Sequence, residues 1–199
     1  MGLLTIIKKQ KLKDKELRCL VLGLDNSGKS TVVDWALSTY KDKPRQPVTP
    51  TVGFQIHTLP YGGHNIQIWD IGGQSTLRPY WDNYFDKTDV LLWIIDIAAA
   101  ARVGESVSEL EVILRNRDRL GYSCRIIVLL NKKDLVDNPT EAIDAMKQRL
   151  DEILKLENIP VEVKATDALS GHGLEELMPT IVGRGKRFGG LESTSGPLG

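Results

Sequence analysis

The sequence predicts an α/β fold built on a mostly parallel sheet. Apolar runs of strand length alternate with helical patterns, and a Gly-Gly turn joins two alternating strands. A glycine-rich loop also lies between the first predicted strand and the first predicted helix. A chain of 199 residues with these features fits one domain that buries its own core.

The predicted elements follow in a regular order. Apolar or alternating runs predict strands at residues 17–23, 54–59, 65–70, 89–96, 124–130 and 159–165. Helical spacing of apolar residues predicts helices at residues 29–40, over 103–114 and over 143–153. The turn at 61–64 makes one strand pair antiparallel, and the polar stretch 38–50, with three prolines, predicts a loop.

Composition excludes several classes of protein. The 26 basic and 26 acidic residues cancel, so the chain has no overall attraction for nucleic acid or for an anionic membrane. No apolar stretch approaches the roughly 20 residues of a membrane span, and residues 3–7 are too short for a signal peptide. Cys19 and Cys124 lie in apolar runs, which predicts buried free thiols in a reducing compartment, the cytoplasm.

The strongest motif is GLDNSGKS at residues 23–30, which fits G-x-x-x-x-G-K-[ST]. Such a loop wraps its backbone N–H groups around phosphates, and the following helix adds its positive N-terminus. Lys29 would reach the β and γ phosphates, and the Ser30 hydroxyl would bind Mg²⁺. The predicted phosphate-binding residues are Gly23, Leu24, Asp25, Asn26, Ser27, Gly28, Lys29, Ser30, Thr31, Thr51 and Gly73.

Two further segments would complete the phosphate and metal site. In WDIGGQ, Asp70 ends a strand and would face Mg²⁺ through a water, while Gly73 lets the backbone approach a γ-phosphate. Gln74 follows and could orient an attacking water, which makes it the candidate catalytic residue. In PTVGF, the Thr51 hydroxyl could join the Mg²⁺ shell when a γ-phosphate holds the loop. Taken alone, either segment could be a simple turn.

The segment NKKD at residues 131–134 ends a later strand and predicts a guanine site. The Asp134 carboxylate can accept hydrogen bonds from N1–H and the exocyclic amine of guanine, a donor pair that adenine lacks. Lys132 can lay its aliphatic stem along the base, and Asn131 completes the motif. In isolation NKKD could be a solvated charged turn, but it lies about 100 residues after a phosphate loop.

Together, and in this order, these motifs resemble the small GTPases. GLDNSGKS, PTVGF, WDIGGQ, LRPYWDNYF and NKKD are similar to the ADP-ribosylation factor (Arf) family. The opening MGLLTIIKKQKLKDKELR resembles the Arf-like type-two subfamily, which is linked to tubulin folding cofactors. The resemblance implies a P-loop small GTPase fold: a six-stranded, mostly parallel sheet with one antiparallel edge hairpin and helices on both faces. It also implies binding of GTP or GDP with Mg²⁺ and slow intrinsic hydrolysis.

The same resemblance assigns further residues. The family's last guanine-binding loop matches KATDA at residues 164–168, where the Ala168 N–H would meet the guanine carbonyl. Asp167 departs from the usual Cys or Ser, and its charge could repel that carbonyl or face solvent. Phe54, Trp69 and Tyr84 would form an aromatic effector face, although Trp69 could instead be ordinary core.

The ends of the chain differ from the middle. We expect an amphipathic, basic segment at 1–16, a GTPase domain at 17–188 and a disordered tail at 189–199. Gly2 lacks the hydroxyl residue four positions on that myristoylation requires, because Ile6 stands there. The apolar stripe of this segment lasts about two turns, which is too short for a stable membrane anchor. Pro179 and the glycines that follow should shorten the last helix.

The expected function is a monomeric GTP-binding switch with partner-stimulated hydrolysis. No arginine is evidently placed to enter the site from within the chain, so a GTPase-activating protein should supply one. The resemblance implies tubulin folding cofactors as effectors and microtubule biogenesis as the process. The alternatives are a GTP-binding interaction module with negligible turnover and an Arf-like trafficking regulator, whereas NKKD disfavours a P-loop kinase or ATPase.

Overall fold

A six-stranded sheet with the order β2-β3-β1-β4-β5-β6 forms the centre of the structure. The structure is a computed structural model that describes residues 15–42, 44–47, 49–121, 123–157 and 160–183. The strands are β1 (Glu16–Leu22), β2 (Phe54–Tyr61), β3 (His64–Ile71), β4 (Val90–Asp96), β5 (Arg125–Asn131) and β6 (Val161–Ala165). Only β2 and β3 pair antiparallel among the described strands, so the predicted mixed sheet with one edge hairpin is confirmed.

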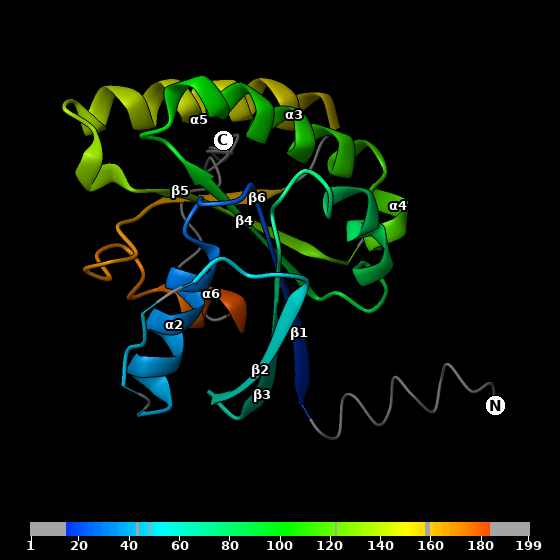
Figure 1. Ribbon diagram of the computed structural model, residues 1–199. Helices are drawn as coiled ribbons and strands as arrows, with labels where there is room; N and C mark the ends of the chain where they lie inside the picture. Colours follow the sequence, from blue (N-terminus) through cyan, green and yellow to red (C-terminus); the bar gives the residue numbers. More distant parts are fainter. Residues whose placement is uncertain (1–14, 43, 48, 122, 158–159, 184–199) are drawn as a thin grey trace, which may run out of the picture.

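Helices cover both faces of the sheet, as Figure 1 shows. One face carries α2 and α6, and the opposite face carries α3 and α5. Shorter helices lie in the connections. The helices are α2 (Lys29–Tyr40), α3 (Ala100–Arg115), α4 (Arg117–Leu120), α5 (Pro139–Glu157) and α6 (Leu177–Ile181), with 3₁₀ turns η1 (Arg78–Tyr84) and η2 (Lys133–Leu135).

Alternation along the buried strands divides the core into two layers. In β1, Leu20 packs with the α3 and α5 side, and its neighbours Cys19 and Val21 pack with the α2 and α6 side. Cys19 and Cys124 are buried free thiols, as the sequence predicts. Burial raises the pKa of Cys19 to about 12, which keeps it an inert apolar side chain.

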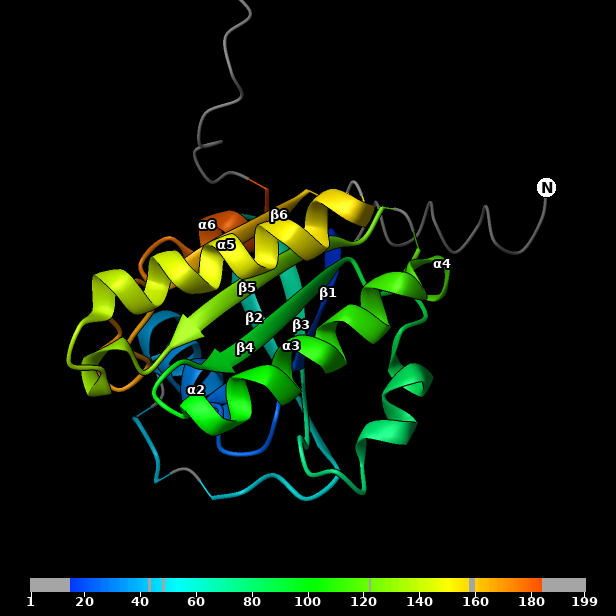
Figure 2. The same cartoon turned by 90° about the horizontal axis from the view of Figure 1, so that it is seen from above.

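The carboxyl ends of the parallel strands meet at one edge of the sheet. Figure 2 shows β4 and β5 pointing to that edge, where α2 begins. The loops that follow β1, β3, β4, β5 and β6 therefore lie close together, as in open α/β sheets that bind ligands at this edge.

Element boundaries differ from the predicted ones by a few residues. The first helix has the predicted bounds, whereas the last strand begins at Val161, after Pro160, and not at 159. Most of the predicted 1–16 segment and the whole 189–199 tail lie outside the described residues, and Glu16 already belongs to β1.

The last described helix, α6, is five residues long. Gly183 follows it with φ 77°, a left-handed conformation that ends a helix. The Arg125 guanidinium donates to the carbonyl of Thr180 at 2.6 Å and to that of Ile181, so a cation covers its C-terminus. The helix is thus as short as its proline and glycines predict.

Candidate functional site

The loop after β1 opens directly into the N-terminus of α2. Gly28 takes φ 96° at the start of this helix, and a Cβ there would overlap the side-chain nitrogen of Asn131. Glycine is therefore required on two grounds, the left-handed backbone and the close approach of an amide. The result is a helix start whose free N–H groups border an open cavity.

The cavity beside this loop has a volume of about 330 Å³. It gathers the ends of several elements: the phosphate loop, the segment around Thr51, and the residues after β3. Its lining is Asp25, Asn26, Gly28, Lys29, Ser30, Thr31, Thr49, Pro50, Thr51, Gly72, Gly73 and Gln74. Of the predicted phosphate-binding residues, Gly23, Leu24 and Ser27 do not line this cavity, and the Leu24 and Ser27 side chains are buried.

Lys29 is the cationic residue that lines this cavity. Its side chain is 6% exposed, and its ammonium donates to the Leu24 carbonyl at 2.8 Å. Burial lowers the pKa of Lys29 to about 8, although the Asp70 and Asp25 carboxylates raise it. A buried ammonium is costly unless an anion compensates it, so the cavity suits a phosphate group.

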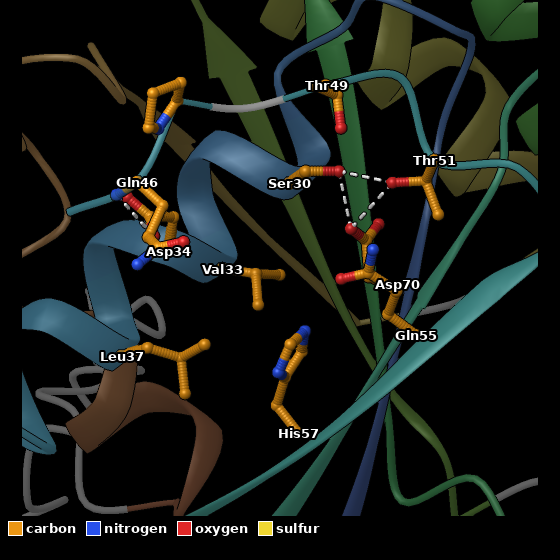
Figure 3. Close-up of a pocket in the computed structure, with 11 residues that line it drawn as sticks. Ser30, Val33, Asp34, Leu37, Gln46, Thr49, Thr51, Gln55, His57 and Asp70 are labelled. Atoms are coloured by element: carbon orange, nitrogen blue, oxygen red, sulfur yellow. Dashed lines mark hydrogen bonds between the residues drawn. The ribbon is translucent and has the colours of Figure 1, made fainter. Parts of the chain in front are cut away.

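Three oxygens gather where this cavity adjoins a second one, which Figure 3 shows: Ser30 and Thr51 line both cavities, and Asp70 lines the second. The Ser30 hydroxyl donates to Asp70 Oδ2 at 2.6 Å and lies 2.8 Å from the Thr51 hydroxyl, which in turn lies 3.4 Å from Asp70 Oδ2. Asp70 is 1% exposed, and burial raises the pKa of its carboxyl. Its second oxygen, Oδ1, is buried with no hydrogen-bond partner.

This oxygen set fits Mg²⁺. Mg²⁺ prefers hard oxygen ligands and is usually held by one or two protein oxygens together with substrate phosphates and water. The orphaned Oδ1 of Asp70 and the raised pKa of its carboxyl both indicate a place where a cation would be stabilising. In the described ranges, no group of three or more His, Cys, Asp or Glu side chains offers a metal site made of protein alone.

Gly73 lies flat against the phosphate loop. Its carbonyl accepts the Asp25 N–H at 3.1 Å, and a Cβ on Gly73 would overlap the Gly23 carbonyl. Gly72 donates to the Gly53 carbonyl at 2.8 Å, which ties the end of β3 to the segment around Thr51. Gln74, the candidate catalytic residue, is partly buried and lines the cavity, as its predicted role requires.

A buried amide joins the phosphate loop to the predicted base site. Asn131 is 1% exposed, and its Nδ2 donates to the Ser27 carbonyl at 2.9 Å. Its Oδ1 accepts hydrogen bonds from the Thr166 hydroxyl at 3.2 Å and from the Ala168 N–H at 3.1 Å. The Ala168 N–H that the resemblance assigns to guanine therefore already has a partner, which a base carbonyl would have to share.

The other predicted base residues lie beside Asn131. Asp134 is exposed in η2, and Lys132 precedes it in a left-handed conformation with φ 63°. Lys132 Nζ lies 2.8 Å from Asp96 Oδ2 at the end of β4. Asp96, which pairs in register with Asn131, was missed from the sequence, although its place at the end of a predicted strand was a usable signal.

The Asp167 carboxylate accepts hydrogen bonds from its own loop. It accepts the Leu169 N–H at 2.9 Å and the Ser170 N–H at 3.3 Å. Partial burial would raise its pKa, but the hydrogen bonds from Ser170 and from these N–H groups lower it. The carboxylate thus stabilises a local Asx turn, a role that was not considered for it from the sequence.

Two arginines lie near the phosphate loop, which the sequence did not indicate. Arg102 pairs with Asp25 at 2.7 Å, and this hydrogen bond lowers the pKa of Asp25. Arg78 is largely buried, donates to the Gly73 carbonyl at 3.1 Å and pairs with Glu105 of α3 at 2.7 Å. Arg102 follows the alanine run after β4, a stretch that carried no signal. Both cations are held by carboxylates.

The three aromatic residues of the predicted effector face meet on the hairpin side. Ring centroids lie 6.1 Å apart for Phe54 and Trp69, 5.7 Å for Phe54 and Tyr84, and 6.2 Å for Trp69 and Tyr84. Phe54 is 50% exposed, whereas Trp69 is partly buried against the core and lies under the Arg18 guanidinium at 3.8 Å. Trp69 therefore packs against the core and also contacts the half-exposed Phe54 ring, and its role in an effector face stays a prediction.

The pKa of Lys29 predicts a pH dependence of nucleotide binding. A bound phosphate should raise this pKa above its value of about 8 in the empty site, so binding takes up a proton between the two values. The contribution of Lys29 to affinity should be full below pH 7, and affinity should fall by up to about tenfold per pH unit above 8. Calorimetry at pH 8 in buffers of different ionisation enthalpy should detect about half a proton taken up per nucleotide. Equal affinity at pH 7 and pH 9 would contradict this account.

The chain matches the ADP-ribosylation factor family over residues 3–184. It is 42% identical to ADP-ribosylation factor-like protein 3 of Chlamydomonas reinhardtii over 178 residues, which cover 89% of this chain and 96% of that protein. It is 39% identical to ADP-ribosylation factor-like protein 2 of Dictyostelium discoideum over 185 residues, which cover 92% of this chain and 94% of that protein.

The fold also resembles a solved structure, the Arl6 BBS3 small GTPase from Trypanosoma brucei with the bound nucleotide analogue GppNp. The TM-score is 0.68 at 25% identity, over 85% of this chain and 99% of that one. Family and fold thus agree with a cavity that is built for phosphate. The chain belongs to the ADP-ribosylation factor family, and is an Arf-like small GTPase that binds GTP as a switch and hydrolyses it.

Proposed function

We propose that this GTPase hydrolyses GTP slowly by itself and rapidly with a GTPase-activating protein, and that it acts in tubulin folding and microtubule biogenesis. The observation that carries the site assignment is the buried ammonium of Lys29 beside the Ser30, Thr51 and Asp70 oxygens. One end of the site thus binds phosphates, and the Asn131 network leads to the other end, which binds the base.

The residues divide into four roles. Residues 23–31 with Thr51 and Gly73 hold the phosphates. Ser30 and Thr51, and Asp70 through a water, hold Mg²⁺, which would neutralise charge on the β and γ phosphates. Asn131, Lys132, Asp134 and Ala168 hold guanine, and Gln74 orients the attacking water.

The arrangement of cations supports a need for an activating partner. Arg102 is paired with Asp25, and Arg78 is paired with Glu105 and bonded to Gly73, so both are neutralised where they stand. Neither is free to stabilise charge developing on a transferred phosphoryl group. An arginine supplied by a partner is worth about 10³–10⁵ in rate in related chemistry.

The link to tubulin rests on similarity at the subfamily level. The opening of the chain resembles the Arf-like type-two subfamily, and relatives named ADP-ribosylation factor-like protein 2 match over 92% of the chain. We further propose a cytoplasmic monomer that uses no nucleic acid and no stable membrane anchor. No helix in the described ranges is long and apolar enough to cross a membrane.

Replacing Gln74 should separate hydrolysis from binding. Gln74→Leu should keep GTP affinity within a few-fold and lower partner-stimulated turnover by about a hundredfold, because the variant retains the phosphate contacts but cannot orient water. Single-turnover hydrolysis, with and without cell extract as a source of activator, measures this. Gln67→Leu is the control, because Gln67 bonds Glu16 at the start of β1. Wild-type turnover that extract does not accelerate would favour the interaction module.

Replacing Asp134 should change base selection. Asp134→Asn should weaken GTP by about tenfold to a hundredfold and favour xanthosine triphosphate, because an amide can donate to its 2-oxo group. Asp137→Asn removes a nearby exposed charge and should leave both affinities unchanged. If GTP affinity in Asp134→Asn matches that of the control, the base-recognition role is wrong.

Capture with purified tubulin folding cofactors tests the cellular role. The Gln74→Leu protein loaded with GTP should retain a cofactor that the Ser30→Asn protein, which lacks the Mg²⁺ hydroxyl and should favour GDP, does not. Capture by neither form would contradict the tubulin role and favour trafficking regulation.

A further inference from the structure

The segment between α2 and β2 passes over a second cavity of about 220 Å³ (Figure 3). This cavity lies between the segment, α2 and β2, with Val33 and Leu37 on the helix side and His57 on the strand side. Because this cavity separates them, the described part of the segment does not pack continuously against α2 and β2. Its position depends on a small number of discrete contacts.

Lys41 at the start of the described segment bonds the Thr58 carbonyl, and Gly53 at its end accepts the Gly72 N–H. Between them, three further contacts hold its described residues. At one end, Thr51 reaches Ser30 and Asp70, at the metal site. Further along, the Gln46 N–H lies 3.4 Å from the Asp34 carboxylate of α2 (Figure 3). The third contact is made by Arg45, which leaves the segment and reaches the loop after β6.

The Arg45 side chain binds backbone carbonyls of the loop after β6, which we call the base loop. The guanidinium donates to the Ala168 carbonyl at 3.0 Å and to the Leu169 carbonyl. The receiving carbonyls are fixed from the other side, because the Ala168 N–H donates to Asn131 and the Leu169 N–H donates to Asp167. A planar guanidinium is suited to two adjacent acceptors that are already held in place.

We propose that Arg45 is a positioning residue that fastens the Thr51 segment to the guanine loop and so slows the release of nucleotide. A nucleotide extends from the Thr51 end of the site to the Ala168 end, and Arg45 joins the two loops that border those ends. Opening one loop then requires breaking its bonds to the other. The inference rests on the assignment of the Ala168 loop to guanine.

The test measures nucleotide dissociation. Fluorescent GDP and a fluorescent non-hydrolysable GTP analogue are chased with unlabelled nucleotide in excess Mg²⁺. Arg45→Ala should release both about three- to tenfold faster, as expected for losing two exposed charge-assisted hydrogen bonds. Arg45→Lys should be intermediate, because an ammonium lacks the planar fork. Lys41→Ala is the matched control: Lys41 donates to the Thr58 carbonyl of β2 and not to the base loop, so release should stay within about twofold of wild type.

Two further readouts distinguish the fastening from a general loosening of the segment. The affinity for inorganic tripolyphosphate with Mg²⁺, measured directly on protein stripped of nucleotide, should be unchanged in Arg45→Ala, because this ligand has no base to be enclosed. The rate of single-turnover GTP hydrolysis should also be unchanged, because Gln74 and the phosphate contacts remain.

Two results would overturn the proposal: release from Arg45→Ala as slow as from Lys41→Ala, or a loss of tripolyphosphate affinity as large as the loss of GTP affinity. Comparison with Asp134→Asn distinguishes a failure of the Arg45 proposal from a failure of the guanine-site assignment on which it rests. If Asp134→Asn and wild type bind GTP alike, the base site itself is wrong, and the fastening falls with it. If Asp134→Asn weakens GTP but Arg45→Ala changes nothing, only the fastening is wrong.

Discussion

The site depends on the buried amide of Asn131. Its nitrogen holds the phosphate loop at the Ser27 carbonyl, and its oxygen holds the base loop at Thr166 and Ala168. Its closeness to Gly28 also excludes any side chain at that position. Each bond is made away from water, where an unpaired polar group is expensive, so the two loops keep a fixed relation to each other. One residue at the end of β5 thus sets the distance between the phosphate and base ends.

Among the described residues, two charges beside the phosphate loop are left for the ligand and its metal to compensate: the Lys29 ammonium and the Asp70 carboxylate. Asp25 is matched by Arg102, and the buried Arg78 is matched by carboxylates of α3. Lys29 has a carbonyl as its hydrogen-bond partner and a pKa lowered by burial, so its charge is the one that a phosphate would compensate. This explains why the site suits an anion, although both arginines that lie beside the phosphate loop in the described ranges are already paired with carboxylates.

The sequence predicted the parts of the site that depend on local pattern. The phosphate loop, the strand-ending Asp70 and the NKKD segment each follow a strand, and parallel strands bring their ends together whatever the rest of the fold does. What could not be predicted comes from long-range side-chain contacts. Arg102 reaching Asp25, and Arg45 reaching Ala168, join positions 77 and 123 residues apart, and no periodicity records such pairs. The Asx turn of Asp167 could not be predicted for a related reason, since it forms only once the loop after β6 has folded.

Buried contacts and contacts of the exposed segment have different consequences for a switch. Contacts made by Asn131 and Gly28 are buried and crowded, so they are costly to break. Contacts made by Thr51, Gln46 and Arg45 lie on a segment with open space beneath it, so they can break singly at a cost set by one or two hydrogen bonds. The nucleotide site is therefore rigid around Asn131, and the segment beside it is held at separate points. Loss of the γ-phosphate at the metal end can then change the position of this segment without unfolding the base end.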